Sequence, residues 1–346
     1  MTHDHASPAG TTSRAARFGG SGVITFEERT LEAPAPGTVR LRVDVCALCG
    51  SDKRLLASGS DVVPGHEIAG TVVDLGEGVS GDLVRGTRGI VYIPVWCARC
   101  DQCTAGQTNR CLALEGLVGW QRDGGFAEHV DVPERCVLPV PDDVPQDVAV
   151  LGLDTVGTAA HGLRMALRTQ DFLPERLLVV GCGPLGLGVV AVARAMGVGE
   201  VQAYDPHPGR LAVAERLGAV PLTDTGGESR FAVTVEVSGA DGARELAQRM
   251  VRPGGAVLAL GESTEPYLMP ATPRWRRTDC FTVRSFYFPL TEVEENWDLL
   301  RRCGPGLRDA LASPVGLADL PAAFEAFVAG DHLKPYVVPT TSGAPA

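Results

Sequence analysis

The chain has 346 residues, of which 45% are hydrophobic, and it carries a formal net charge of −11. This length suits two domains better than one. The acidic balance argues against a nucleic acid or an anionic membrane as a partner, because either would favour clustered Lys and Arg, and leaves a small molecule as the expected partner.

At the N-terminus, residues 1–18 are polar and lack the apolar centre of a signal peptide. No apolar run in the chain reaches the roughly 18 residues that a membrane span needs. We therefore expect a cytoplasmic protein in which residues 1–18 form a disordered arm.

The first part of the chain predicts β structure. Val39 to Val45 alternate apolar and charged residues, as a half-buried strand does, and short strand-like runs separated by Gly and Pro continue to about Pro141. Residues 19–154 are therefore predicted to form an all-β domain.

Alternating strands and helices follow in a second predicted domain, residues 155–292. The expected strands are 177–181, 200–204, 233–237 and 256–260, and the expected helices are 185–196 and 210–217. This alternation predicts a doubly wound parallel sheet, so the overall fold class is α/β.

Two predictions concern the end of the chain. Residues 281–288 alternate β-branched and aromatic residues and are expected to form a sheet-edge strand, which favours a homodimer or homotetramer. Residues 293–346 are expected to hold a helix and a final strand, Lys334 to Val338, that returns to the first domain.

Four cysteines are the most specific local pattern. The spacing C-x2-C-x2-C-x7-C lets four thiolates converge on one tetrahedral ion and leaves no position open for a substrate, so it predicts a structural zinc lobe over residues 94–113. An iron–sulfur cluster is the alternative, although its bacterial pattern ends C-x3-C-P. The predicted ligands are Cys97, Cys100, Cys103 and Cys111.

A glycine-rich turn follows the first strand of the second domain. It has the form G-x-G-x-x-G and opens a helix, so its backbone can approach a pyrophosphate. The predicted cofactor-binding residues of this turn are Gly181, Gly183, Pro184, Leu185 and Gly186.

Asp205 ends the next strand, nineteen residues after Gly186. A carboxylate there accepts hydrogen bonds from the adenosine ribose hydroxyls and repels a 2′-phosphate, which favours NAD(H) over NADP(H). Arg210 lies close enough in sequence to weaken that preference and is a further candidate for cofactor binding. The alternative is that Asp205 only caps a helix.

A second, open metal site is predicted ahead of the cofactor domain. Cys49, His66 and Glu67 supply the thiolate, imidazole and carboxylate groups that a catalytic zinc uses while one position stays open. A single Cys or His in such a sequence is more often structural, so the prediction depends on their occurring together.

Together these motifs resemble the zinc-dependent medium-chain dehydrogenase/reductase family, in the branch of sorbitol, threonine and related polyol dehydrogenases. The resemblance covers residues 23–340 and includes CGSD at 49–52, PGHE at 64–67 and DGGFAEHV at 123–130. It implies a GroES-like β domain, completed by the C-terminal segment, joined to a Rossmann domain, with the active site in the cleft between them.

The resemblance also implies individual roles. Cys49 and His66 would bind the catalytic zinc, Asp52 would orient His66, and Ser51 would hydrogen-bond the reacting oxygen. The carboxylate expected near the start of the cofactor domain aligns with Asp154, where many relatives carry Glu, so Asp154 and Glu67 both stay as candidate ligands.

One position departs from the family pattern. Where many relatives carry a His that passes the proton to solvent, this chain has Arg54, which stays protonated. Either Lys53, a water chain or the cofactor hydroxyls carry the proton, or Arg54 meets an anionic or polyhydroxylated substrate. The alternative is a surface cation.

The expected function is therefore a zinc-dependent alcohol dehydrogenase with two zinc ions per chain, one catalytic and one structural. It would transfer a hydride between NAD(H) and a secondary alcohol or ketone of a polyol, sugar, cyclitol or aminocyclitol. One alternative is a biosynthetic NAD(P)H-dependent reductase of a keto-sugar or deoxysugar. Another is a non-catalytic nucleotide-sensing protein on the same fold.

Substrate choice is expected to depend on three loops with aromatic residues, 92–96, 117–121 and 275–278. Their rings would either line a pocket or pack in a core.

Overall fold

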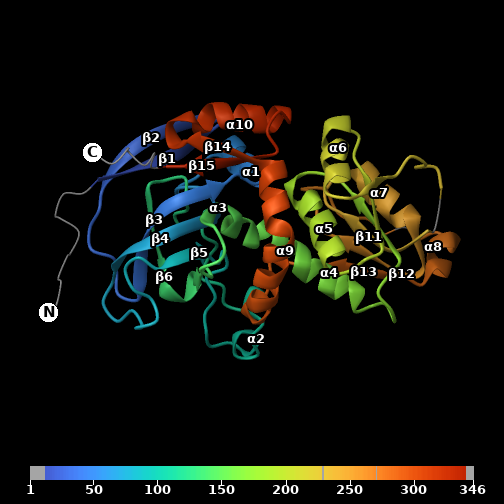
Figure 1. The fold of residues 1–346 in the computed structure, drawn as a ribbon, viewed down its shortest axis with the longest axis horizontal. Coiled ribbons are helices and arrows are strands. Elements are labelled where there is room, and N and C mark those ends of the chain that lie inside the picture. Colours follow the sequence, from blue (N-terminus) through green and yellow to red (C-terminus); the bar gives the residue numbers. More distant parts are fainter. Residues whose placement is uncertain (1–11, 228–229, 270, 340–346) are drawn as a thin grey trace. The chain divides into compact units, whose positions relative to one another are not determined.

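A computed structural model describes residues 12–227, 230–269 and 271–339, and Figure 1 shows the arrangement of their helices and strands. The chain forms two compact units. Unit 1 contains Met1–Leu153 and Leu311–Ala346, and unit 2 contains Asp154–Ala310. Within the described ranges, no helix combines the length and the apolar character needed to cross a membrane.

Unit 1 is built on a seven-stranded sheet in the order β14-β15-β3-β4-β5-β7, with β6 paired to β3. The long strand β3 alternates buried and more exposed side chains over part of its length and confirms the predicted strand near Val39. The strands are β3 (Thr38–Ala47), β4 (Glu67–Leu75), β5 (Arg88–Val91), β6 (His129–Pro133), β7 (Val137–Pro139), β14 (Ala312–Gly316) and β15 (Lys334–Val338).

An antiparallel hairpin precedes this sheet and corrects the prediction of a disordered arm over residues 1–18. Strand β1 (Thr12–Gly20) pairs with β2 (Val23–Thr30), and the described residues of the predicted arm lie in β1. Phe18 is buried and stacks on Phe126, with ring centroids 6.0 Å apart. Burial of this aromatic side chain stabilises a segment whose polar composition predicted disorder. Residues 1–11 lie outside the described ranges.

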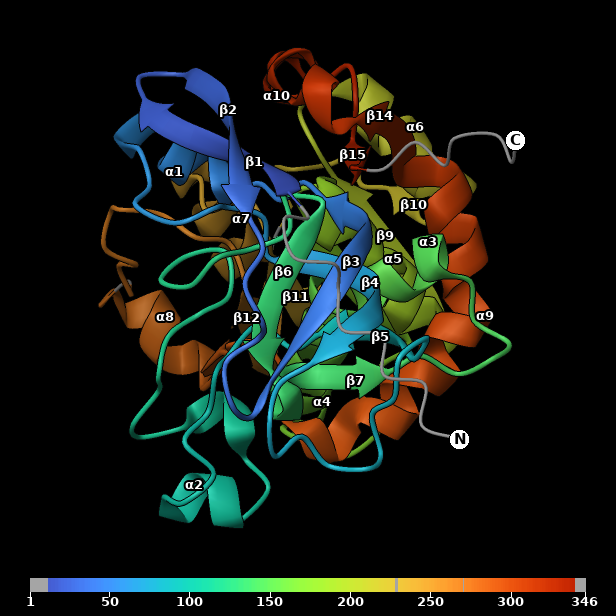
Figure 2. The same cartoon turned by 90° about the vertical axis from the view of Figure 1, so that its left-hand side faces the viewer.

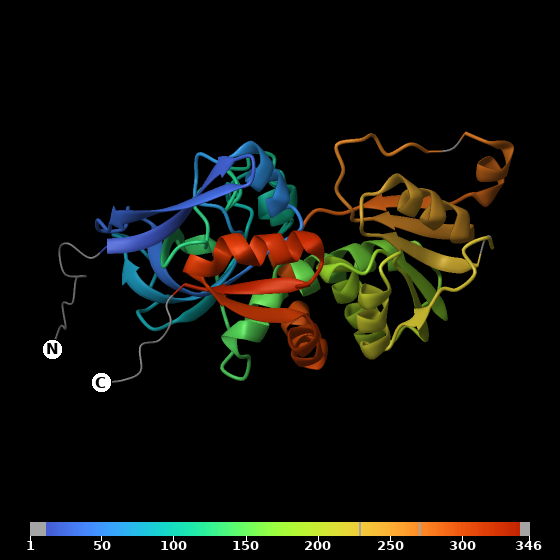
Figure 3. The ribbon, with the colours of Figure 1, turned by 90° about the horizontal axis from the view of Figure 1, so that it is seen from above.

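The C-terminal segment closes the unit 1 sheet, as predicted for the strand that begins at Lys334. Strand β15 is parallel to β14 and antiparallel to β3. Helix α10 (Leu320–Ala329) packs on β15, and Figure 3 shows this last helix beside the strands of the same colour. The remaining helices of unit 1 are α1 (Asp52–Ser58), α2 (Asp101–Thr104) and α3 (Gln146–Ala149).

Unit 2 contains the predicted doubly wound sheet. Its six strands are all parallel and run in the order β10-β9-β8-β11-β12-β13, which is the order of a dinucleotide-binding fold. Figure 2 labels β9, β10, β11 and β12 of this sheet and four helices of the same unit, α4 (Ala159–Leu167), α5 (Pro184–Ala195), α6 (Pro208–Arg216) and α7 (Asp241–Met250). The strands are β8 (Arg176–Val180), β9 (Glu200–Tyr204), β10 (Val220–Pro221), β11 (Phe231–Glu236), β12 (Val251–Ala259) and β13 (Phe281–Arg284).

The helices of unit 2 include the two predicted from sequence. They are α4 (Ala159–Leu167), α5 (Pro184–Ala195), α6 (Pro208–Arg216), α7 (Asp241–Met250), α8 (Pro273–Thr278) and α9 (Val293–Leu311).

Two predicted boundaries in this region differ from the structure. Strand β13 lies at the sheet edge but ends at Arg284 rather than at 288, because Tyr287 adopts a left-handed φ of 44°, which interrupts an extended strand. The chain was predicted to return to the first domain from residue 293, but helix α9 belongs to unit 2 up to Ala310, and the return begins at Leu311. Just before α9, Glu292 accepts hydrogen bonds from Arg164 (2.7 Å) and contacts His161 (2.9 Å), both on α4.

Candidate active site

Cys49 and His66 lie in unit 1, and one buried carboxylate contacts both residues. Asp52, the first residue of α1, accepts a hydrogen bond from the backbone N–H of Cys49 at 2.9 Å. Its other oxygen lies 3.1 Å from Nδ1 of His66. A proton on Nδ1 donates to this oxygen, so the ring presents Nε2 as the nitrogen suited to a metal. The sequence-based expectation that Asp52 contacts His66 is confirmed.

The loop before His66 can form only because small residues surround it. Gly65 has a φ of 95°, and a Cβ atom there would lie 2.8 Å from Sγ of Cys46. A Cβ atom on Gly124 would lie 2.1 Å from the carbonyl oxygen of Gly65. The two segments instead form a close backbone ladder, in which Gly125 N–H donates to Gly65 O at 2.7 Å. The DGG sequence of the family motif is therefore the support for the loop that carries His66.

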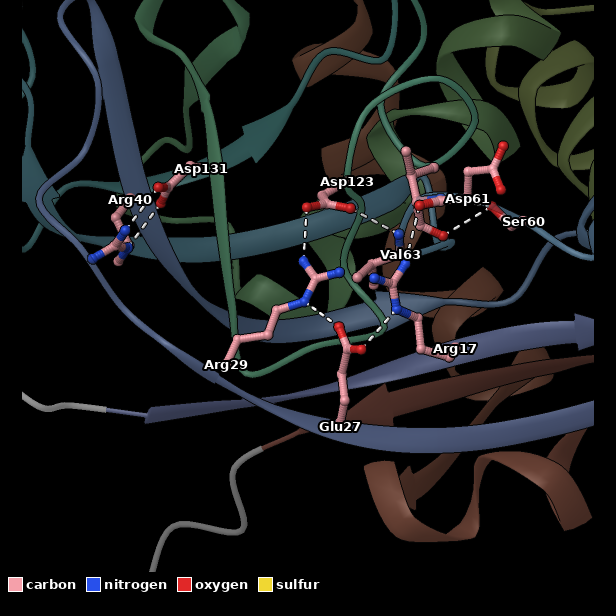
Figure 4. A network of polar contacts seen from close by, with 10 residues as sticks. Arg17, Glu27, Arg29, Arg40, Ser60, Asp61, Val63, Asp123 and Asp131 are labelled. Carbon is pink, nitrogen blue, oxygen red and sulfur yellow. Dashed lines mark hydrogen bonds and ion pairs between the residues drawn. The ribbon is translucent and has the colours of Figure 1, made fainter.

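A chain of charges ties this support to the N-terminal hairpin, as Figure 4 shows. Asp123 accepts a hydrogen bond from the backbone N–H of Val63 at 2.8 Å and pairs with Arg29 on β2 at 2.8 Å. Glu27 joins Arg29 to Arg17 on β1. Both partners of each of these ion pairs are partly exposed, so each pair contributes little to stability. Together they link strands β1 and β2 to the loop that precedes His66.

Glu67 is engaged by a residue that sequence analysis did not identify as part of the site. Nζ of Lys334, on β15, lies 2.6 Å from Oε1 of Glu67 and 3.3 Å from the carbonyl oxygen of Leu48. The two charged side chains are 1% and 0% exposed. They lie 267 positions apart in the sequence, and only the pairing of β15 with β3 brings them together.

Cys49, His66 and Glu67 converge in unit 1. Their candidate ligand atoms, one thiol, one imidazole nitrogen and one carboxylate oxygen, lie within 4.8 Å of one another. This donor set is of the kind that binds zinc in catalytic sites, so these residues fit the predicted ion. The remaining candidate ligand, Asp154, begins unit 2 in a π-helical turn (Asp154–Thr158), where its Oδ1 accepts a hydrogen bond from Thr158 at 2.9 Å.

The four-cysteine lobe converges as predicted. The Sγ atoms of Cys97, Cys100, Cys103 and Cys111 all lie within 4.8 Å of one another. All ten cysteines lie in the described ranges, and all ten are free thiols. Backbone N–H groups point at the sulfur atoms: for example, that of Cys97 donates to Cys111 Sγ at 3.3 Å, and that of Leu112 donates to Cys100 Sγ at 3.4 Å. Four thiols with backbone donors around them fit a structural zinc ion.

The lobe polarises its thiols in opposite directions. Backbone N–H groups, from Cys103 first and Leu112 second, lower the pKa of Cys100 to about 6. Burial raises the pKa of Cys103 to about 12. In the metal-free lobe Cys100 is therefore the first of these two thiols to lose its proton as the pH rises. Cys103 would lose its proton on binding a metal cation.

The glycine turn in unit 2 follows β8 and opens α5, as predicted. Gly181 has a φ of 104°, and a Cβ atom on Gly186 would lie 1.9 Å from the carbonyl oxygen of Gly181. Gly183 is the residue before the first helical turn, and Pro184 is the first helical residue. A Cβ atom placed on Gly183 would have no atom of the other described residues within 4 Å, apart from its neighbours in the chain. The turn therefore needs Gly181 and Gly186 for its own shape, while Gly183 leaves space beside the helix N-terminus.

Asp205 follows β9 and braces the same turn. Its two oxygens accept hydrogen bonds from the backbone N–H groups of Cys182 (2.7 Å) and His207 (2.8 Å). A carboxylate oxygen can accept more than one hydrogen bond, so these contacts are compatible with binding a ribose. Arg210 lies in the first turn of α6, and its buried Nε has no hydrogen-bond partner among the described residues.

A third feature of unit 2 had no signal in the sequence analysis. Glu236 ends β11 and is fully buried, and its Oε1 accepts hydrogen bonds from the backbone N–H groups of Ser238 and Gly239, both at 2.7 Å. This carboxylate holds the turn after β11 at the same sheet edge as the glycine turn, because β11 and β8 are parallel neighbours.

The aromatic loops take different roles. Tyr92 is 1% exposed and its hydroxyl lies 3.1 Å from Thr108 Oγ1, so it packs in the core. Trp275 packs on the hydrophobic core of unit 2. Trp120 instead lies beside His66, with ring centroids 5.8 Å apart, and the guanidinium carbon of Arg54 lies 5.0 Å from the centroid of its ring.

Comparison with known proteins agrees with these features. Residues 35–142 match the family of alcohol dehydrogenase GroES-like domains. The chain is 34% identical over 262 residues to L-threonine 3-dehydrogenase of Chelativorans sp. (strain BNC1), covering 69% of this chain and 73% of that protein. It is 30% identical over 256 residues to L-galactonate-5-dehydrogenase of Escherichia coli (strain K12), covering 69% and 73%.

Solved structures extend the similarity to nearly the whole chain. An alcohol dehydrogenase from Thermus sp. ATN1 superposes with a TM-score of 0.85 at 26% identity, covering 94% of this chain and 100% of that one. An acetophenone reductase from Geotrichum candidum, solved with NAD, gives a TM-score of 0.81 at 25% identity, covering 94% and 97%. The chain therefore belongs to the medium-chain alcohol dehydrogenase superfamily and is an oxidoreductase of the zinc-binding, nicotinamide-dependent type.

Proposed function

We propose that this enzyme transfers a hydride between NAD(H) and a secondary alcohol or ketone, with a polyol, sugar, cyclitol or aminocyclitol as its substrate. The observation that carries the proposal is the buried Asp52, which holds Cys49 and His66 together beside Glu67. The relatives support the substrate class, because threonine and galactonate each contain a secondary alcohol.

Each residue of the proposed site has a separate task. Cys49 and His66 hold the zinc ion, and Asp52 keeps the imidazole in the orientation that presents Nε2. Bound zinc would polarise the carbon–oxygen bond of the substrate, and bound nicotinamide would exchange the hydride. Ser51, the residue before α1, would relay the proton of the reacting oxygen: its Oγ accepts that proton and passes the proton of its own hydroxyl to a water chain or a cofactor hydroxyl.

For the carboxylate ligand we favour Asp154 over Glu67. The Lys334 ammonium 2.6 Å from Glu67 competes with a metal cation for the same carboxylate. Asp154 directly follows Leu153, which is buried in unit 1, and the helical turn just before it (Val150–Gly152) packs on β4, the strand that Glu67 begins. Glu67 would then tune the site rather than coordinate the ion.

The cofactor would bind to unit 2, with its pyrophosphate at the turn that contains Gly183. Asp205 supports a preference for NAD(H) over NADP(H), because a buried carboxylate beside the glycine turn would repel a 2′-phosphate. Arg210 would contact the same ribose.

The four-cysteine lobe supports a second, structural zinc ion. The exposed edge strand β13, whose Phe281 is half exposed, supports association into a homodimer or homotetramer.

The test of this function is NAD⁺ reduction by the zinc-loaded enzyme over a panel of polyols, sugars, cyclitols and aminocyclitols. We expect at least one secondary alcohol to be oxidised, with a higher kcat/KM for NAD⁺ than for NADP⁺. Asp205→Ala is expected to reduce that cofactor preference. Oxidation with NADP⁺ alone would refute the role of Asp205, and no turnover of any alcohol or matching ketone would refute the substrate class.

A further inference from the structure

Trp120 lies close both to the predicted zinc ligand His66 and to a cation, Arg54. The His66 and Trp120 ring centroids are 5.8 Å apart, and the Arg54 guanidinium carbon is 5.0 Å from the Trp120 centroid. The distance from the Arg54 guanidinium carbon to the centroid of the His66 ring is therefore at most the sum of these two distances. All three side chains belong to unit 1.

The loop that carries Trp120 is held tightly. The backbone N–H of Trp120 donates to Leu117 O at 3.1 Å, and that of Gly119 donates to Arg122 O at 2.8 Å. A Cβ atom on Gly119 would lie 2.8 Å from backbone atoms of Gly65, so this loop packs directly on the segment before His66. Trp120 therefore forms a fixed surface beside the site.

One polar atom of Trp120 lacks a partner. Its indole Nε1 is buried and has no hydrogen-bond partner within the described part of the chain. Indole N–H is a donor only, and a buried donor without an acceptor is costly. An acceptor oxygen on a ligand would satisfy it.

Arg54 supplies a charge of the opposite sign to such an oxygen. It lies in the first turn of α1 and its side chain is exposed, while the neighbouring Lys53 points its ammonium over Phe327 at 4.8 Å. The two cations thus stack on different aromatic rings. Guanidinium stays protonated, stacks on aromatic faces and binds carboxylate or phosphate through two parallel hydrogen bonds.

We propose that Arg54 and Trp120 form a subsite for an anionic group, a carboxylate or a phosphate, on the substrate that is oxidised beside His66. The Arg54 fork binds the anionic oxygens and the Trp120 N–H donates to an oxygen of the substrate. The inference rests on the proposed function, because it assumes that the reacting carbon lies at the Cys49 and His66 site. It assigns the position where relatives carry a His to substrate selection rather than to proton exit.

The test uses matched pairs of secondary alcohols that differ only in charge, with the full-length, zinc-loaded enzyme. One arm compares aldonates with the corresponding aldonamides, and a second arm compares polyol phosphates with the free polyols. The readout is the ratio of kcat/KM between the charged and neutral members. Where neither member of a pair is oxidised, the same ratio is taken from dissociation constants, measured by quenching of Trp120 fluorescence with Trp120→Phe as the blank.

In the wild-type enzyme we expect the charged member of one arm to be favoured by about 10- to 100-fold, the range expected for a charge-assisted hydrogen bond. Arg54→Gln is expected to bring this ratio to about 1, and Arg54→Lys to restore part of it. Lys53→Gln, which removes the neighbouring cation, is expected to leave the ratio within about threefold of wild type, because its ammonium stacks on another ring. The arm that shows the preference identifies the group as carboxylate or phosphate.

A ratio that is the same in Arg54→Gln as in the wild type would overturn the subsite, as would a wild-type preference for the neutral member in both arms. Failure of the proposed function gives a different result. In that case Cys49→Ser would turn over both members of a pair as fast as the wild type does, whatever their ratio.

Discussion

Replacing Lys334 by methionine would leave the Glu67 carboxylate buried without its cation. Both side chains are almost fully buried and their charged atoms are 2.6 Å apart. Removing one partner of a buried ion pair costs about 3–5 kcal/mol of unfolding free energy. Unit 1 falls in the size range where each kcal/mol lowers the melting temperature by about 2–4 °C, so its transition is expected to fall by about 6–20 °C.

Calorimetry of the full-length, zinc-loaded protein measures this shift. Arg42→Met is a matched control, because Arg42 lies on β3 of the same sheet and pairs with Asp44 at 2.8 Å, but its side chain is 45% exposed. This control is expected to cost at most about 1 kcal/mol. The double variant Glu67→Met/Lys334→Met should recover most of the loss, because it removes both charges of this pair and leaves neither without its partner.

Two results would refute this reasoning. One is a Lys334→Met transition no lower than that of Arg42→Met. The other is a double variant that is less stable than Lys334→Met alone, since the cost would then come from lost packing and not from an unpaired carboxylate. Repeating the series after zinc removal by a chelator separates the ion pair from any effect on metal binding.

Three further perturbations test other parts of the structure. Gly124→Ala is expected to lower the free energy of unfolding by about 1–3 kcal/mol and to reduce zinc content, because a Cβ atom there meets a backbone carbonyl oxygen at 2.1 Å. Gly81→Ala serves as its control, because a Cβ atom at Gly81 meets no atom of the other described residues within 4 Å. Equal melting temperatures of the two variants would contradict the proposed support. Gly186→Ala should lower the melting temperature of unit 2, while Gly183→Ala should leave it unchanged and weaken NADH binding, measured by fluorescence titration; tight NADH binding by Gly183→Ala would argue against a pyrophosphate at this turn. Burial alone would raise the pKa of Glu292, but hydrogen bonds and charges from His161 and Arg164 lower it below the usual 4.5. The stability that Glu292 provides is therefore fully present above about pH 4.5, and it is lost as the pH falls through the lower pKa of the folded state. Glu292→Gln should therefore melt below wild type at pH 7, with a difference that shrinks below pH 4.5, and a difference independent of pH would exclude this origin.

Local patterns made the parts of the site that lie close together in the chain predictable. The four cysteines fall within fifteen residues, so their spacing alone indicates that they converge. The glycines that shape the turn and the helix that follows it are likewise adjacent in the sequence. The first strands and helices of unit 2 were predictable for the same reason, because Glu200–Tyr204 and its neighbours carry strong periodic patterns.

Contacts between distant segments were not predictable. Lys334 looked like the start of a terminal strand, and only the sheet register places it on Glu67. The segment from Thr12 to Phe18 looked disordered because its composition is polar, yet burial of Phe18 against Phe126 orders it. Tyr92 and Trp120 were indistinguishable as loop aromatics, because the sequence does not show which ring faces the core.

The metal content of three proteins, measured together with NAD⁺ reduction, tests the central claim most directly. Wild type is expected to contain two zinc ions per chain, and Cys49→Ser and Cys103→Ser one each. Cys49→Ser should have lost turnover while keeping the wild-type melting temperature of the lobe, and Cys103→Ser should retain turnover at low temperature and lose it on mild heating. Full zinc content with full turnover in Cys49→Ser would contradict the assignment of the catalytic site.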